Sequence, residues 1–223
     1  MKILVLGASG LLGNALYRHL QQNQKYQCYG SIRTHAVRHY FPVFARDNLI
    51  NVADLTDFAS IEQLVADLRP NTIINCLCAP KPDMNSLDKI IPILSLVPQY
   101  LKCLCNKYSA RLIHISTNAV FDGARGYYNE SEIPDSSSFY GIAKILGEVS
   151  GVNVVTIRSS FIGHSLPSSR GSDLLSWLLR NKDKNCAGYT RCIFNGLTNI
   201  ELAKIIEKYF LDSRLSGIYH VAG

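Results

Sequence analysis

Tyr140 and Lys144 are spaced so that they could act together on a proton. Residues four positions apart on a helix share a face, so the phenol and the ammonium group would point into the same space. A neighbouring cation favours the phenolate, and we expect Lys144 to lower the pKa of Tyr140 below its usual value of about 10. Such a phenol could give or take a proton near neutral pH. Because the chain holds twelve tyrosines, this spacing also arises by chance, and its meaning depends on the elements around it.

A glycine-rich turn near the N-terminus is expected to bind phosphate. It joins an apolar run over Lys2–Leu6, predicted as a strand, to a predicted helix over Leu11–Gln22. The first glycine would permit a tight turn, the second would let backbone amides approach a pyrophosphate, and the third would let the helix pack closely on the strand. The helix N-terminus adds amide donors and the positive end of a dipole. We therefore predict a dinucleotide site made by Gly7, Ser9, Gly10, Leu11, Leu12 and Gly13. The spacing is G-x-x-G-x-x-G rather than G-x-G-x-x-G, and a turn without a ligand is the alternative.

The end of the second predicted strand indicates which dinucleotide is bound. Proteins of this fold place an acidic residue there for the ribose hydroxyls of NAD, whereas Tyr29–Arg33 holds neither Asp nor Glu. Arg33, helped by Ser31, could instead hold a 2′-phosphate, the alternative being a solvated surface arginine. We predict NADP(H) as the cofactor, with Asp54 and Leu55 near the adenine.

The rest of the chain alternates between strand and helix patterns. Strands are predicted at 2–6, 26–30, 49–52, 72–77, 111–115, 152–157 and 217–221, and helices at 11–22, 57–68, 87–108, 139–150, 172–180 and 198–209. Pro92 and Pro98 should make the long helix irregular. This alternation predicts an α/β fold, a Rossmann-like doubly wound parallel sheet with helices on both faces.

Two parts of the chain are expected to differ in role. Residues 1–158 would form an NADP-binding Rossmann domain. Residues 159–223 would form a small, partial substrate-binding lobe interleaved with the last Rossmann elements. Because the chain ends directly after its last predicted strand, we expect this lobe to be incomplete and the chain to be shorter than its parent.

The composition of the chain excludes several classes of protein. The net charge of +6 comes without a dense Lys/Arg run, so no nucleic acid is expected, although a mild positive field suits ligands with several phosphates. The apolar runs are too short for a membrane span or a signal peptide, and a cytoplasmic location is expected. Seven cysteines without a C-x-x-C pair indicate buried free thiols in a reducing compartment, and we expect no metal site.

The order of these motifs resembles the extended short-chain dehydrogenase/reductase superfamily. Residues 115–123 (ISTNAVFDG) resemble the S-T-D-Y-V-F-D-G segment of dTDP-4-dehydrorhamnose reductases of the RmlD type. Residues 140–148 (YGIAKILGE) are similar to their Y-G-x-S-K-L-x-G-E helix. Residues 157–163 (IRSSFIG) resemble their R-T-S segment beside the nicotinamide.

The resemblance implies a mechanism. NADPH would deliver hydride to a keto carbon of a sugar, and Tyr140 would donate a proton to the developing alkoxide. Lys144 would contact the nicotinamide ribose, and Thr117 would hydrogen-bond the carbonyl oxygen. The alternatives are an ordinary helical pair for Tyr140 and Lys144 and a strand-end cap for Thr117. The further cofactor contacts that it implies are Cys76, Leu77, Cys78, Ser116, Phe161 and Ile162.

The chain departs from the family pattern where the substrate would bind. Asn118-Ala119 replaces an Asp-Tyr pair, and Leu94 stands where the family often has Asn in I-N-S-x-x-P. The substrate-binding candidates are Asn118, Tyr189, Arg191 and Thr198, of which the last three could equally be structural.

These motifs favour an NADPH-dependent reductase of a nucleotide-linked 4-keto-6-deoxy sugar in surface polysaccharide synthesis, with a homodimer as the expected assembly. A sugar-nucleotide epimerase or dehydratase is a second hypothesis, which the missing acidic residue disfavours. A third is a catalytically silent NADP-binding regulatory subunit, like the β subunits of methionine adenosyltransferase. The lost Asp-Tyr pair and the short C-terminus favour it, and the retained Thr117, Tyr140 and Lys144 disfavour it. A cofactor-binding sensor is also left open.

Overall fold

The computed structural model describes residues 1–79, 86–166 and 173–223. Within them lies a seven-stranded sheet in the order β3-β2-β1-β4-β5-β6-β9, with every pairing parallel. The strands are β1 (Lys2–Leu6), β2 (Gln27–Ile32), β3 (Leu49–Asn51), β4 (Thr72–Asn75), β5 (Arg111–Ile115), β6 (Val154–Arg158) and β9 (Gly217–His220). This is the doubly wound parallel sheet predicted from the sequence.

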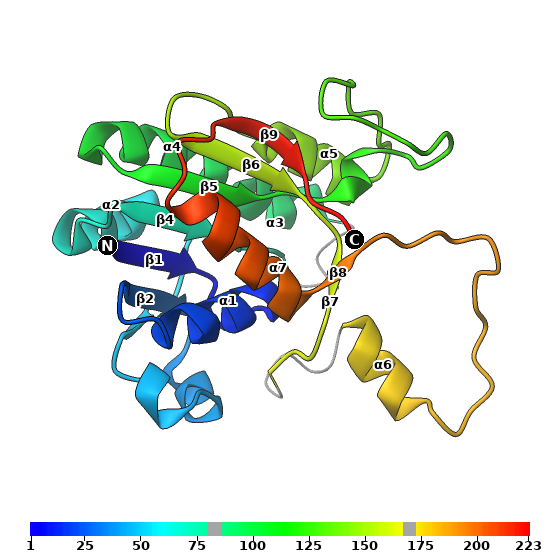
Figure 1. Cartoon of the computed structure of the whole chain (residues 1–223), viewed down its shortest axis with the longest axis horizontal. Coiled ribbons are helices and arrows are strands. Elements are labelled where there is room, and N and C mark those ends of the chain that lie inside the picture. Colours follow the sequence, from blue (N-terminus) through cyan, green and yellow to red (C-terminus); the bar gives the residue numbers. More distant parts are fainter. Residues whose placement is uncertain (80–85, 167–172) are drawn as a thin grey trace.

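Helices cover both faces of the sheet because successive strand residues point to opposite sides (Figure 1). Ile3 and Val5 lie in one core cluster with side chains of α1 (Leu11–Gln21) and α7 (Asn199–Ile205). Leu4 and Leu6 lie in the other, with side chains of α2 (Phe58–Leu68) and α4 (Val97–Tyr108). The apolar runs predicted as buried strands are therefore buried on both faces.

The long helix predicted over 87–108 is divided. It consists of α3 (Leu87–Ile91), a π-helical turn (Pro92–Leu96) and α4, and each proline lies at the first or second residue of its segment. Proline lacks an amide hydrogen, so it interrupts the i to i−4 ladder where the sequence predicted irregularity. A second π-helical turn (Ile206–Leu211) continues α7.

Several short elements were not predicted. Two 3₁₀ turns (His35–Tyr40 and Val43–Ala45) lie between β2 and β3, and a third spans Asn118–Val120. β7 (Phe161–Ile162) and β8 (Leu197–Thr198) form a separate two-stranded parallel sheet.

Residues 173–196, which precede β8, stand apart from the main sheet in Figure 1. They include α6 (Leu174–Arg180), none of whose residues is buried, and the extended chain of 181–196. The predicted start of this helix at Ser172 lies outside the described residues. Although β9 and α7 follow residue 158, they complete the main sheet and cover it, and the division at 158/159 stays a prediction.

The strand order places the site. Moving outward from β1, the chain goes to β2 and β3 on one side and to β4 and the later strands on the other. The direction of the strand order therefore changes between β1 and β4, and ligands of such sheets bind at the carboxyl ends of the strands at this point. In the described residues, no helix is long and apolar enough to cross a membrane.

Candidate functional site

The glycine turn after β1 is tightly packed against the start of α1 and the end of β4. Gly7 has φ +80°, and a Cβ atom there would lie 3.2 Å from the carbonyl oxygen of Cys76. A Cβ atom on Gly13 would lie 2.1 Å from the carbonyl oxygen of Gly7. Side chains at these two positions would collide with backbone, so glycine lets the helix begin directly against the strand.

The first turn of α1 is open to an anion. Its N-cap is Gly10, whose backbone is extended and which has no side chain to bond the amides of the first turn. That turn holds no acidic residue, and the side chain of Leu12 is buried in the core. A helix N-terminus with free amides and a positive dipole end suits a pyrophosphate.

Ser31 has a structural role that was not predicted. Its side chain is fully buried, and its Oγ accepts a 3.0 Å hydrogen bond from the amide of Gly7. The amide of Ala8 also bonds the Ser31 carbonyl, at 2.9 Å. Ser31 thus fixes the glycine turn to β2, and its buried hydroxyl is already bonded to the Gly7 amide, while its contact with a 2′-phosphate stays a prediction.

Arg33 and Asp54 are exposed at the ends of β2 and β3. Hydrogen bonds from Thr56 lower the pKa of the Asp54 carboxyl, and the charge of Arg33 contributes to the same shift. The two charged groups therefore lie near each other, with half-buried Leu55 next along the chain. This edge could meet an adenosine through a guanidinium and a carboxylate together.

The segment after β4 borders the glycine turn. Cys76 and Leu77 are half-buried, and the Leu77 side chain would be 3.1 Å from a Cβ atom on Gly7. Cys78 is exposed. The expectation of buried thiols is correct for Cys28 and Cys105. It is wrong for Cys78, Cys103, Cys186 and Cys192, which are exposed on loops or on a helix surface.

Thr117, Tyr140 and Lys144 come together at the carboxyl end of β5. Tyr140 and Lys144 lie on α5 (Phe139–Gly147), and the side chains of Thr117 and Cys78 lie close enough to the phenol to shift its pKa. The Lys144 ammonium is buried and donates to the carbonyl of Ile115 at 2.7 Å. Thr117 also accepts from the amide of Ala119 at 3.1 Å, so it caps the following turn as well as lying near the phenol.

The expected lowering of the Tyr140 pKa is not found. Burial raises the pKa of the phenol, helped by the neighbouring Cys78, and the neighbouring Thr117 opposes this only in part. Burial also lowers the pKa of Lys144. The prediction is wrong because desolvation of the phenol outweighs any attraction by the ammonium, which is bonded to a backbone carbonyl instead. Tyr140 is therefore a protonated phenol at neutral pH, the form that can donate a proton.

Two glycines set the position of α5. A Cβ atom on Gly147 would lie 1.9 Å from the carbonyl oxygen of Leu94, and one on Gly141 would lie 2.6 Å from that of Ala119. Ser95, on the π-helical turn, donates to the carbonyl of Ala143 at 2.7 Å. This close approach holds Tyr140 and Lys144 over the end of β5.

Other predicted residues frame the same end of the sheet. Ser116 is buried, and Asn118 is exposed with its Oδ1 accepting a 2.5 Å hydrogen bond from Ser160. Phe161 and Ile162 are half-buried in β7, which follows β6 directly. Asn118 thus ties the turn after Thr117 to the segment after β6.

The C-terminal substrate candidates lie between α6 and β8 and at the start of α7. Tyr189 is 92 % exposed, and Arg191 is exposed in the same extended segment. Thr198 is the N-cap of α7, and its hydroxyl accepts from the amide of Glu201 at 3.1 Å. Thr198 also pairs with Ile162 of β7. The neighbouring Leu197 donates its amide to the carbonyl of Ser160, whose hydroxyl bonds Asn118.

Sequence reasoning gave no role to a buried ion pair behind the site. Glu148 and Arg158 are joined by two hydrogen bonds, of 2.8 and 2.7 Å. The sequence does hold a signal, because Glu148 stands one helical turn beyond Lys144 and Arg158 is the one charged residue of the strand that it ends.

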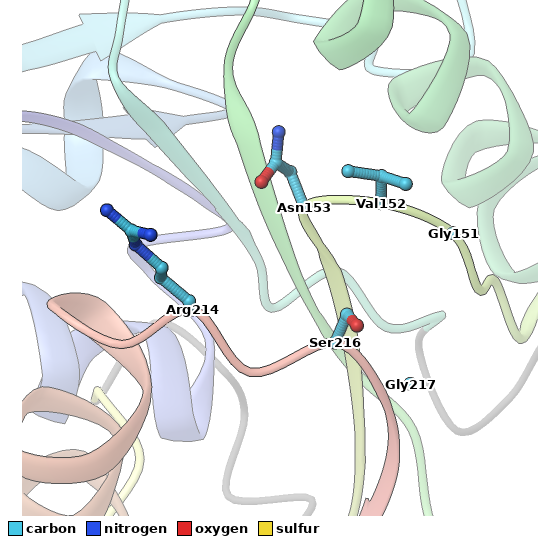
Figure 2. Close-up of a pocket in the computed structure, with 6 residues that line it drawn as sticks. All are labelled: Gly151, Val152, Asn153, Arg214, Ser216 and Gly217. Atoms are coloured by element: carbon cyan, nitrogen blue, oxygen red, sulfur yellow. The ribbon is translucent and has the colours of Figure 1, made fainter.

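An open pocket of about 710 Å³ lies at the other end of the sheet (Figure 2). It is formed by the turn before β6 and the segment before β9, and its lining residues are Gly151, Val152, Asn153, Arg214, Ser216 and Gly217. These segments precede the strands whose carboxyl ends carry the site, so the pocket is separated from Thr117 by the length of the sheet.

The sequence model of the RmlD substrate binding domain family matches residues 1–185. The chain belongs to this family. Among curated relatives, it is 32 % identical to methionine adenosyltransferase 2 subunit beta of Xenopus laevis, over 100 % of this chain and 67 % of that protein. It is 29 % identical to the probable low-salt glycan biosynthesis reductase Agl14 of Haloferax volcanii, over 100 % of this chain and 74 % of that protein.

A solved structure with the same fold is the hypothetical dTDP-4-dehydrorhamnose reductase of Sulfolobus tokodaii. The TM-score is 0.81 at 26 % identity, covering 100 % of this chain and 77 % of that one. The chain spans 41 to 74 % of the length of the curated relatives named above and of the β subunits of other vertebrates. The RmlD-type resemblance and the α/β fold expected from the sequence are both confirmed.

Proposed function

We propose that this protein is an NADPH-dependent reductase of a nucleotide-linked 4-keto-6-deoxy sugar. One observation carries the proposal: the side chains of Thr117 and Tyr140 lie near each other at the end of β5 where the buried Lys144 ammonium bonds the Ile115 carbonyl, at the same end of the sheet as the glycine turn. The similarity to a glycan biosynthesis reductase and to an RmlD-type fold supports the same reading.

The residues around the glycine turn fit a dinucleotide. The turn would be filled by a Cβ atom at Gly7 or Gly13, and the first turn of α1 offers uncapped amides with no acidic side chain nearby. In the proposal, the backbone of residues 9–13 holds the pyrophosphate, and Cys76, Leu77, Phe161 and Ile162 border the nicotinamide half. When bound, NADPH would supply the hydride.

The roles of the chain's own groups follow from their chemistry. Thr117 would donate a hydrogen bond to the keto oxygen and stabilise the charge that develops there. Tyr140, whose pKa burial raises, would hold its proton until that oxygen becomes basic enough to take it. Lys144 would contact the nicotinamide ribose and place positive charge beside the phenolate left after the transfer.

The choice of NADPH over NADH rests on Arg33. Its guanidinium is exposed at the end of β2 and could form charge-assisted bonds with a 2′-phosphate. Asp54 nearby would repel that phosphate or bond a free ribose hydroxyl, so the two side chains favour opposite cofactors. We propose that Arg33 prevails, because a carboxylate already bonded twice by Thr56 at 2.7 Å is a weaker ligand.

A turnover assay tests the proposal. The purified protein is incubated with NADPH and a set of nucleotide-linked 4-keto-6-deoxy sugars, and the nicotinamide absorbance is followed. We expect oxidation with at least one sugar. NADPH binding without oxidation by any sugar in the set would contradict the reductase assignment.

The match with methionine adenosyltransferase β subunits favours a second candidate, an NADP-binding regulatory subunit without turnover. The chain is 32 % identical to the Xenopus laevis subunit over its whole length, and Asn118-Ala119 replaces the Asp-Tyr pair of the reductases. The same assay separates the two, because a regulatory subunit binds NADPH and leaves every keto sugar unreduced.

A further inference from the structure

A buried acidic side chain connects the elements that carry the proposed catalytic groups. Glu148 follows the last residue of α5 and is its C-cap. Its two carboxylate oxygens accept from Nε and Nη2 of Arg158, at 2.8 and 2.7 Å. The Glu148 and Arg158 side chains are only 8 % and 3 % exposed, so this bidentate pair is held away from water.

The same carboxylate holds the residue before Thr117. Oε1 of Glu148 accepts a 2.8 Å hydrogen bond from the Ser116 hydroxyl. One turn earlier on α5, Lys144 donates to the carbonyl of Ile115. Two consecutive residues at the end of β5 are thus fixed by side chains from consecutive turns of one helix, and Thr117 leaves β5 from this anchored point.

Arg158 also contacts the edge strand of the sheet, β9. Its Nη1 lies 3.2 Å from Nε2 of His220 on β9, and its guanidinium stands 5.1 Å from the centre of the Phe121 ring. Because a guanidinium only donates, Nε2 of His220 accepts in this contact. The network therefore joins α5, β5, β6 and β9 behind the proposed reacting groups.

The charge of Glu148 also acts on Lys144. Burial lowers the pKa of the Lys144 ammonium, and the Glu148 carboxylate opposes that shift, together with Cys78 and Cys76 from the segment after β4. On β5, the buried imidazole of His114 is the other titratable group that interacts with this ammonium. Glu148 is the carboxylate among these neighbours, so Glu148→Gln removes one of the negative charges that oppose the effect of burial on this ammonium.

We propose that Glu148 is a positioning residue of the active site: it fixes Ser116, and through it Thr117, and it places a negative charge one helical turn from Lys144. The inference rests on the proposed reductase function for its kinetic consequences, while its electrostatic part can be measured without turnover. Neither partner of Glu148 is itself proposed to exchange a proton with the substrate.

Glu148→Gln separates charge from shape. It keeps an oxygen that can accept from Ser116 and removes the negative charge. The control is Glu62→Gln, which neutralises a surface carboxylate bonded to Lys107 and Tyr100. We expect Glu148→Gln to lower kcat about tenfold with little change in KM. The alkaline limb of the pH profile should move to lower pH, because Lys144 then loses its proton sooner. A fall in kcat without that movement would indicate a merely structural role and overturn the electrostatic part.

Two further measurements keep the proposal testable. In protein with ¹³C-labelled lysine, NMR titration of the Lys144 side chain should give a lower midpoint in Glu148→Gln than in the wild type, and no change in Glu62→Gln. An unchanged midpoint overturns the proposal even if the protein never turns over a sugar. If Glu148→Gln does not fold, Ser116→Ala removes the anchoring hydroxyl alone. It should lower kcat while the Lys144 midpoint stays in place, and an unaffected kcat would contradict the role of the anchor.

Discussion

Replacing Gly13 by alanine should abolish cofactor binding before it abolishes folding. The new Cβ atom would lie 2.1 Å from the carbonyl oxygen and 2.8 Å from the carbonyl carbon of Gly7, whereas ordinary contact begins near 3.4 Å. Both neighbours are backbone atoms, so α1 must move away from the turn by more than 1 Å. Overpacking of this kind costs about 1–3 kcal/mol, and the displaced amides are those that would meet the pyrophosphate.

The measurement compares urea unfolding and NADPH binding, followed by fluorescence, in wild type and Gly13→Ala. A matched control is Gly188→Ala, since a Cβ atom at Gly188 would meet nothing within 4 Å. We expect the control to behave as wild type, and Gly13→Ala to lose about 1–3 kcal/mol of stability and at least tenfold in NADPH affinity. Unchanged affinity in a folded Gly13→Ala would refute the assignment of this turn as the phosphate site.

Three further predictions concern the chemistry, the cofactor and the core. Tyr140→Phe should lower kcat by about 10²–10⁴-fold while the affinity for NADPH is retained. The control Tyr209→Phe, at an exposed tyrosine, should change neither kcat nor affinity. An equal loss of kcat and affinity in Tyr140→Phe would indicate that the phenol is structural. Arg33→Glu should weaken NADPH binding about tenfold to a hundredfold and leave the affinity for NADH unchanged. The control is Arg18→Glu, at an exposed arginine toward the far end of α1. Equal effects on both cofactors would contradict the 2′-phosphate contact. Burial, and then the charge of Lys144, lower the pKa of His114 well below 6.5 in the native state. Below pH 6.5 the unfolded chain therefore binds a proton that the native state does not bind, and the free energy of unfolding falls as the pH drops. The slope should reach about 1.4 kcal/mol per pH unit in urea unfolding and disappear in His114→Gln, while identical slopes would show that the buried imidazole accepts its proton.

The fold could be predicted because its pattern is local. Apolar runs ending in glycine, helical spacing in 11–22 and 57–68, and prolines at 92 and 98 all act on nearby backbone, and β5 and the N-terminus of α5 were placed to the residue. The 3₁₀ turns of 35–45 and the β7–β8 pairing were missed, because short elements depend on tertiary contacts more than on periodicity.

The residues of the candidate site were predicted from the sequence, but the burial and hydrogen bonding of Tyr140 and Ser31 were not. Tyr140 and Lys144 do share a helix face, yet the sequence does not show how deeply a phenol is buried, and desolvation decides its pKa. Ser31 was placed at the right strand end, but its period-2 position turns the hydroxyl inward to the amide of Gly7. The Glu148–Arg158 pair depends on contacts between β6 and the end of α5, which no local pattern specifies.

The most direct measurement follows the hydride itself. NADPH deuterated at the transferring position is incubated with the protein and a nucleotide-linked 4-keto-6-deoxy sugar, and the product is analysed by mass spectrometry. We predict deuterium at the former keto carbon with wild-type protein, and about 10²–10⁴-fold slower labelling with Tyr140→Phe. Unlabelled sugar from wild-type protein that binds NADPH would contradict the proposed reduction.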